Sequence, residues 1–192
     1  AALEMEQQNK TVRLMLEVTN PEKDHRKKIK QKHYLPEEVR AGDVVDTKGF
    51  DVRFDEKKKM AFLTREDEFG PGETKKYEVV IRDVWKFPQS RVEVMDTRAQ
   101  LALKELNGSV YEESAKFLVD EINVKLKEIR DSEALTVNPE QHIGIFRLNE
   151  KRYANAKINC ERLEKMMSIV RAKKLKSLET GKVQNVLHKL KA

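Results

Sequence analysis

The stretch YEVVIRDVWKFPQSRVEVMDTRAQ, Tyr77 to Gln100, changes its apolar period in the middle. Up to Trp85, apolar and polar residues alternate, as in a strand with one buried face. From Ser90 onward, the apolar residues are three and four positions apart, as on one face of a helix. The stretch therefore predicts a β-domain that runs directly into a helix, with Pro88 stiffening the joint.

The start of that helix has its own signal. Ser90 and Glu93 fit the capping box S-x-x-E, in which the hydroxyl and the carboxylate accept hydrogen bonds from otherwise unpaired backbone N–H groups. We therefore expect the helix to begin at Ser90 and to leave the last strand in a defined direction.

The composition suits a chain with long, solvated helices. Of the 192 residues, 38% are charged and 6% are aromatic, whereas an ordinary domain is about 25% charged. The 39 basic and 33 acidic residues are interspersed, so the net charge of +6 indicates a mixed surface rather than a polycation. Intrinsic disorder is the competing interpretation, and the regular apolar spacing argues against it.

The cysteine count, the hydropathy and the first residues of the sequence give further constraints. The single cysteine, Cys160, excludes an internal disulfide. No run of 18 apolar residues occurs, so we expect no transmembrane segment. The sequence opens AALEMEQQNK without an initiator methionine, and we interpret it as a processed or excised piece of a longer chain.

Residues 11–86 carry strand and turn signals without helix signals. Alternation predicts strands in TVRLMLEVT, KKIKQKHYL and KKYEVVIRDVW, and FDVRFD with MAFLTR predicts a hairpin around residues 55–59. Asn20-Pro21 predicts a turn. Pro71-Gly72 predicts a type II turn, because proline presets φ at its second position and glycine takes a positive φ at its third. Five to seven short strands of this kind indicate a small β-sandwich.

The order of these pieces resembles an immunoglobulin-like module that recurs in bacterial and archaeal envelope and surface-layer proteins. The matching pieces are LEVTNP, HYLPEEV, DTKGFDVRFD and FGPGETKKYEVVI. In such modules an N-P turn follows the first core strand, LP closes the next, and a P-G-E-T segment introduces the last. The resemblance implies a spacer or adhesive role and an extracytoplasmic location in the cell envelope.

A second helix is predicted from about Pro139 to Thr180. Asn138 is its expected N-cap and Pro139 its first helical residue. Two apolar columns follow with a seven-residue repeat, which is the pattern of a coiled-coil seam. The seam residues are Phe146, Tyr153, Cys160 and Met167 in one column and Ala156, Leu163 and Val170 in the other. Gly181 is expected to end the helix.

The first helix is expected to run from Ser90 to about Leu135. Its apolar face is predicted to include Ala99, Leu103, Leu106, Val110 and Phe117. The phase slips beyond these residues, so we expect a bend or a local loosening at Asn107-Gly108.

The two helices would each measure roughly 60–65 Å. Matched lengths and the short connection at 136–138 favour an antiparallel hairpin with Gly181 beside Ser90; a bent rod that dimerises in parallel is the alternative. The predicted fold class is therefore segregated α+β, with an immunoglobulin-like β-sandwich followed by a helical hairpin. The predicted parts are an N-terminal extension (1–10), the sandwich (11–87), a two-helix coiled-coil arm (88–181) and an amphipathic tail (182–192).

The sequence contains no constellation that would carry catalysis, bind a cofactor or hold a metal ion. The histidines are scattered, whereas a zinc site needs three or four converging ligands, and we interpret His25, His33, His142 and His188 as surface residues. Cys160 lies on the seam without a base assigned by any motif, which favours a buried, inert thiol. Nucleotide-binding and hydrolase motifs are missing. We therefore expect no enzyme activity, no cofactor and no metal.

Basic clusters raise a second hypothesis. Arg171, Lys173, Lys174 and Lys176 fall within two helical turns, and a second run spans residues 26–32. Contacts to phosphates need such charges, but no aromatic residues alternate with them to stack on bases. We expect solvated faces, with binding to nucleic acid, anionic lipid or an acidic surface polymer through Arg171–Lys176 as the alternative.

The first functional hypothesis is a non-enzymatic structural or spacer module that mediates protein–protein assembly within a larger envelope-associated polypeptide. The helical arm would contact a protein partner or another copy through leftover apolar positions such as Leu118, Ile169 or Leu175. Packing of these residues against the β-module is the competing explanation. A third hypothesis is a helical adaptor that captures a partner helix.

Overall fold

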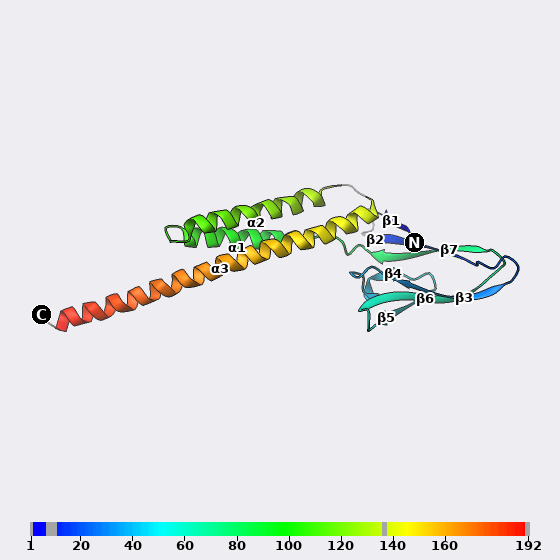
Figure 1. Cartoon of the computed structure of the whole chain (residues 1–192), viewed down its shortest axis with the longest axis horizontal. Coiled ribbons are helices and arrows are strands. Elements are labelled where there is room, and N and C mark those ends of the chain that lie inside the picture. The colour runs from blue at the N-terminus through cyan, green and yellow to red at the C-terminus, as the bar shows by residue number, and fades with distance from the viewer. Residues whose placement is uncertain (1, 7–10, 136–137, 191–192) are drawn as a thin grey trace. The chain divides into compact units, whose positions relative to one another are not determined.

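The computed structural model describes residues 2–6, 11–135 and 138–190, and the side chains of residues 11–135 and 138–177. These residues form two compact units. The β unit comprises residues 2–6, 11–86 and 138–144, and the helical unit comprises residues 87–135 and 145–190. The predicted segregation of strands and helices is confirmed (Figure 1).

The β unit contains two antiparallel sheets. In the first sheet the strand order is β1 (Ala2–Glu6), β2 (Thr11–Thr19), β7 (Thr74–Arg82) and β4 (Val44–Asp46). In the second the order is β3 (Lys27–Tyr34), β6 (Met60–Phe69) and β5 (Asp51–Asp55), and a short 3-10 helix, Ala41–Asp43, precedes β4. The predicted hairpin is confirmed by the pairing of β5 with β6. Residues 2–6, assigned from the sequence to an N-terminal extension, pair with β2.

The alternation along the strands builds the core of the β unit. Leu14 and Leu16 on β2 and Ile81 on β7 are buried, as a period of two requires for one face of a sheet. The two sheets meet through Tyr77 of β7. Its hydroxyl donates to Asp67 of β6 at 2.9 Å and accepts from Gln31 of β3 at 3.1 Å.

A side-chain hydrogen bond joins the two predicted turns, at Asn20-Pro21 and at Pro71-Gly72. Gly72 has a φ of +61°, which glycine adopts readily, and the backbone N–H of Glu73 donates to the carbonyl of Gly70 at 3.1 Å. The buried Asn20 side chain donates to the same Gly70 carbonyl at 2.8 Å. This hydrogen bond links the turn after β2 to the turn before β7.

The helical unit consists of three helices packed together, so the predicted two-helix hairpin is wrong. They are α1 (Gln89–Leu106), α2 (Glu112–Glu133) and α3 (Pro139–Leu190), whose first turn belongs to the β unit. Figure 1 shows α1 and α2 beside each other and beside the middle of α3. A single first helix to Leu135 does not exist, because the chain reverses after Leu106.

Polar contacts between the helices define their directions. α1 runs parallel to α3, because successive residues of α1 contact successive residues of α3: Arg91 with Glu150, Arg98 with Glu164, and Glu105 with Arg171. α2 runs antiparallel to α3, because the order is inverted: Glu121 with Asn159 and Glu128 with Arg152. α3 is thus flanked by both short helices.

The reversal occurs where the sequence predicted only a bend. Leu106 and Ala115 are both fully buried, but nine residues of continuous helix would place them on opposite faces. The helix is therefore interrupted between these residues. Gly108 has a φ of +71°, and its N–H donates to the Glu112 carboxylate at 2.8 Å. Ser109 closes the turn by donating from its hydroxyl to the Leu106 carbonyl at 2.6 Å.

Of the two helix starts that the sequence predicts, the start of α3 is confirmed and the start of α1 is not. α3 begins at Pro139, and the Asn138 side chain accepts a hydrogen bond from the Gln141 N–H at 2.9 Å, which confirms the predicted N-cap. α1 begins at Gln89 with Pro88 as its N-cap and no side-chain capping bond. The capping box predicted at Ser90 is therefore wrong, because Ser90 already lies inside the first turn.

Gly181 does not end α3, which continues to Leu190. One glycine in a helix costs only about 1 kcal/mol relative to alanine, too little to stop a long helix by itself. The predicted position of Gly181 beside Ser90 is also wrong. Ser90 precedes the Arg91 that pairs with Glu150, and Gly181 lies roughly 45 Å further along the parallel helix.

One continuous core holds the three helices together. Val110 and Phe117, which the sequence placed on the apolar face, are 84% and 63% exposed. Val110 lies in the turn between α1 and α2, and Phe117 faces outward from α2. The buried residues are Phe87, Val92, Met95, Ala99, Ala102 and Leu106, then Ala115, Leu118, Val119, Ile122, Leu126 and Ile129, and finally Ala156, Cys160, Leu163, Met167 and Val170.

We predict that Leu126→Ala destabilises the helical unit by about 2–5 kcal/mol, because it leaves a cavity in this core. Leu101→Ala is the matched control, since Leu101 is 55% exposed; its effect should stay within about 0.5 kcal/mol. Urea unfolding followed by helical circular dichroism measures both changes. Equal effects of the two substitutions would contradict the three-helix core.

Candidate functional site

The predicted seam of α3 is already covered within the chain. Five of its seven residues are buried in the core that α1 and α2 complete: Ala156, Cys160, Leu163, Met167 and Val170. Tyr153 is partly buried and its ring lies 5.5 Å from that of Phe87, while Phe146 is half-buried. The seam is therefore packed internally, and any surface for a partner must lie elsewhere on the helices.

A buried asparagine in the same seam was missed from the sequence. Asn149 is fully buried, seven residues before Ala156 in the companion column. Its amide donates to Glu133 at 2.9 Å, and its carbonyl oxygen accepts from Ser132 at 3.0 Å and from Arg152 at 2.9 Å. A polar residue at a seam position favours the one helix register in which its hydrogen-bond partners on the neighbouring helix lie opposite it. The seven-residue spacing to Ala156 was the available signal.

The exposed apolar side chains gather on the helical unit. Of the twelve large apolar residues that are strongly exposed among the described side chains, ten lie in the helical unit. The other two, Val45 and Phe54, lie in the β unit. Singly exposed apolar side chains are ordinary on a folded domain, whereas a contiguous apolar patch indicates a contact surface.

One of these apolar surfaces is a shallow groove between α2 and α3, of about 470 Å³. Phe117 and Leu118 of α2 and Met166 of α3 form its apolar lining. Its rim carries Glu113 on α2 and Arg162 on α3, so both signs of charge flank it. We call this surface the α2–α3 groove.

Heptad neighbours extend the apolar surface in both directions. Val124, seven residues after Phe117 and thus on the same face of α2, is 53% exposed. Ile169, seven residues after Arg162 on α3, is 39% exposed. Of the residues first proposed to recruit a partner, Ile169 and Leu175 are exposed, whereas Leu118 is 6% exposed and packs in the core.

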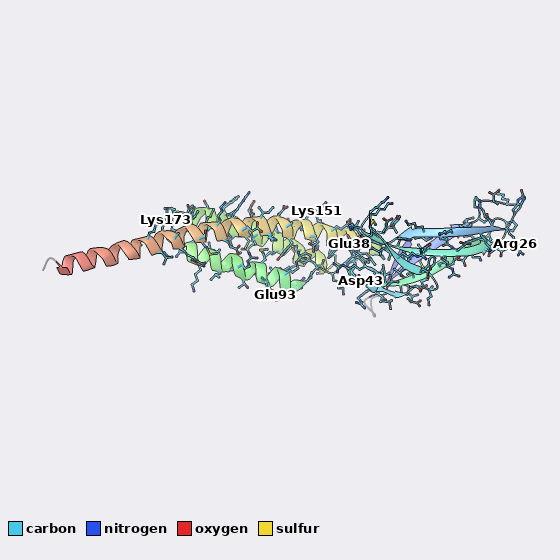
Figure 2. The ribbon with its side chains drawn as sticks, turned by 90° about the horizontal axis from the view of Figure 1, so that it is seen from below. Arg26, Glu38, Asp43, Glu93, Lys151 and Lys173 are labelled. Atoms are coloured by element: carbon cyan, nitrogen blue, oxygen red, sulfur yellow. The ribbon has the colours of Figure 1, made fainter. Side chains whose placement is uncertain are left out.

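The basic residues near the end of the described α3 side chains differ in their contacts. Arg171 makes a two-pronged ion pair with Glu105 of α1, with 2.6 Å between Nη2 and Oε2, and this hydrogen bond lowers the pKa of Glu105. Lys176 also interacts within the chain. Lys173, labelled in Figure 2, and Lys174 are exposed and line a second pocket, at the turn between α1 and α2.

The other basic run, residues 26–32, is balanced by acidic side chains of the β unit. Lys27 lies 3.4 Å from Glu22, and Arg26, labelled in Figure 2, lies 3.8 Å from Glu68. Lys30 stands opposite Glu66 in the pairing of β3 with β6. Cross-strand pairs of opposite charge stabilise a sheet, so this run is explained by the fold.

An aromatic pair on the same face was invisible in the linear sequence. Tyr34 lies directly opposite Phe62 of the neighbouring strand, with the ring centroids 5.7 Å apart. The Lys32 ammonium sits 4.1 Å from the Phe62 centroid and 3.4 Å from the Asp55 carboxylate. Tyr34 follows the lysine run in the sequence, but its partner Phe62 comes from a distant strand, so the linear pattern does not predict the pair.

The remaining candidate groups carry no catalytic arrangement in the described part of the chain. Cys160 is buried, and burial raises the pKa of its thiol, which disfavours the nucleophilic thiolate. His25 is exposed, but His33 and His142 are only partly exposed, contrary to the expected surface histidines. His142 contacts the Asp83 carboxylate at 3.1 Å, and burial lowers the pKa of His33. The side chain of His188 lies outside the described residues.

Among the described residues, no three His, Cys, Asp or Glu side chains converge as metal ligands do. No helix in the same residues is long and apolar enough to cross a bilayer.

Comparison with known proteins found no matching family model, no matching curated protein and no matching solved structure. The resemblance of residues 11–86 to immunoglobulin-like modules therefore stays a prediction.

We predict that Asp55 titrates with a pKa of about 2, below its ordinary value of 3.8, chiefly because the Tyr34 hydroxyl donates to it at 2.6 Å. Because the folded pKa is lowered, ionised Asp55 contributes stability above about pH 4 that is lost as the pH falls through 2. Carboxyl-carbon NMR measures the titration, and Tyr34→Phe should raise the pKa. Titration of the unmodified protein near 3.8 would refute the arrangement.

We also predict that Asn149→Ala destabilises the helical unit by about 1–3 kcal/mol, because it leaves Ser132, Glu133 and Arg152 without their buried partner. Asn155→Ala is the matched control: Asn155 is an exposed asparagine of the same helix, so the change in helix propensity is the same. Denaturant unfolding compares the two variants. Indistinguishable free energies of unfolding would show that the buried cluster has no structural effect.

Proposed function

We propose that this chain is a non-enzymatic structural module whose helical unit mediates assembly with a second copy of itself through the α2–α3 groove. The observation that carries the proposal is the apolar α2–α3 groove itself, lined by Phe117, Leu118 and Met166 and continued along the same helices by the exposed Val124 and Ile169. Burying such side chains between two copies removes apolar surface from water, which is the main driving force of association.

The charges around the groove favour a second copy as its occupant. Glu113 and Arg162 lie on opposite rims, on α2 and α3. A two-fold axis along the groove brings the same surface of two copies together, so each acidic rim can face the partner's basic rim. Glu113 already contacts Lys116 at 2.9 Å. Its carboxylate would therefore keep one basic partner when the interface excludes water.

The apolar length of the surface is also adequate. Phe117 and Val124 occupy successive heptad positions of α2, and Ile169 extends the surface along α3. A stable interface needs about 800 Å² from each partner. A contact that follows α2 and α3 over several turns can supply such an area, whereas the groove alone cannot.

The β unit is proposed to act as an immunoglobulin-like spacer in a larger envelope-associated polypeptide. Two antiparallel sheets in contact through Tyr77, and the linked turns at Asn20 and Gly72, support this assignment. The envelope location rests on the resemblance of the turn and strand motifs alone. In this role its strands provide length and stability.

The polyanion hypothesis for Arg171–Lys176 has weaker support. The guanidinium of Arg171 is directed at Glu105, so a phosphate would have to displace an existing two-pronged ion pair. No aromatic side chain lies among the four basic residues. We therefore rank assembly above polyanion binding.

We predict that the chain forms a dimer at tens of micromolar and that Phe117→Asp converts it to a monomer, because the new charge would be buried at the dimer interface. Sedimentation equilibrium measures the mass. Val94→Asp is the matched control: Val94 is 55% exposed on α1, outside the groove, and its replacement should leave the dimer intact.

A monomer for the unmodified chain at 100 μM would overturn the proposed self-association. Loss of the dimer in both variants would place the contact outside the groove and overturn it as well. Circular dichroism of each variant verifies that the helices are retained.

A further inference from the structure

The second pocket of the helical unit lies where the turn between α1 and α2 meets α3, and its volume is about 310 Å³. Val110 and Tyr111 of the turn and Val170 of α3 supply its apolar side, and Lys173 and Lys174 of α3 supply its basic side. We call it the tip pocket. It shares no residue with the α2–α3 groove.

The tip pocket carries more basic than acidic charge. Glu105 lines the pocket, but its carboxylate is held by Arg171. Glu112, next to the lining residue Tyr111, accepts from the Gly108 N–H at 2.8 Å and from Lys116 at 2.9 Å. Neither Lys173 nor Lys174 forms an ion pair with a carboxylate in the described part of the chain. The pocket therefore presents two ammonium groups that attract an anionic partner.

The apolar side of the pocket is held in place before any partner binds. The Ser109 hydroxyl donates to the Leu106 carbonyl and accepts from the Tyr111 N–H at 3.1 Å. The Tyr111 carbonyl in turn accepts from the Ala115 N–H at 2.8 Å, at the start of α2. Val110 nevertheless remains 84% exposed. A rigid turn that holds an aliphatic side chain in solvent loses little conformational freedom on binding.

The seam of α3 becomes polar and exposed beyond the tip pocket. Val170 is the last buried seam residue among the side chains described up to residue 177, and the next two positions of the seam are Lys174 and Ser177. All side chains from residue 171 to 177 are exposed, although the helix continues to Leu190. Figure 1 shows α3 running past the turn between α1 and α2. The face of α3 beyond the tip pocket is thus left open for an additional segment.

From this juxtaposition we propose that the tip pocket binds a short acidic peptide segment that carries an aliphatic side chain. The aliphatic group would pack on Val110, Tyr111 and Val170, and adjacent carboxylates would contact Lys173 and Lys174. Two lysines next to an apolar wall match a peptide better than a nucleic acid, whose phosphates need a longer row of cations. The tip pocket has two lysines and one glutamate, which is already paired with Arg171, so its net charge is positive and it selects a different partner chemistry from the α2–α3 groove.

The test uses the full chain and a fluorescein-labelled nonapeptide of six glutamates and three leucines. We expect saturable binding by fluorescence anisotropy at physiological salt, weakened at least tenfold by the double substitution Lys173→Glu, Lys174→Glu and by Val110→Asp. The matched control is Lys151→Glu, Lys165→Glu: both are exposed lysines of α3 outside the tip pocket, and their replacement should leave affinity within twofold.

Two comparison probes separate the chemistry. A nonapeptide with glycine in place of leucine should bind at least tenfold more weakly, and an oligothymidylate of equal charge should not bind at the pocket. Equal affinity of the pocket variants and the unmodified chain would overturn the proposal. Equal binding of the glycine peptide or of the oligothymidylate would also overturn it, in favour of a general polyanion site. All residues substituted here lie outside the lining of the α2–α3 groove, and sedimentation equilibrium of each variant distinguishes a loss of peptide binding from a change in self-association.

Discussion

The arrangement of the helical unit depends on one constraint: the apolar seam of α3 must be covered by helices that are much shorter than α3 itself. A lone helix in water gains little from its own hydrogen bonds, so its stability comes from burying an apolar face. α1 and α2 together cover the seam up to Val170, and they can do so only because the chain reverses between Leu106 and Ala115. The reversal places α1 parallel to α3 and α2 antiparallel to it.

The polar contacts between the helices follow from the same arrangement. Arg91, Arg98 and Glu105 are seven residues apart along α1, and each contacts a residue of opposite charge on α3. These contacts are partly exposed, so each contributes little to stability. Their regular spacing and the buried Asn149 cluster instead select one register among those that an apolar seam would tolerate.

The two surfaces of the helical unit differ in the partner chemistry that they favour. The α2–α3 groove is apolar with both signs of charge on its rim, which suits contact with an identical surface. The tip pocket combines an aliphatic wall with two lysines whose neighbouring carboxylates are engaged elsewhere. Charge distribution, rather than apolar area, is what distinguishes a self-complementary face from one that selects a different partner.

The sequence by itself determined the local structure: the strand from Thr11 to Thr19, the turn at Gly72, the N-cap at Asn138 and the seam from Ala156 to Val170. Each of these follows from spacing or backbone preference within a few residues. Tertiary structure decided which helices cover that seam, since the sequence predicts only a bend or a local loosening at Asn107-Gly108 and not the reversal of the chain. It also decided the pairing of Tyr34 with Phe62 and the isolation of Lys173 and Lys174, because both depend on residues far apart in the chain.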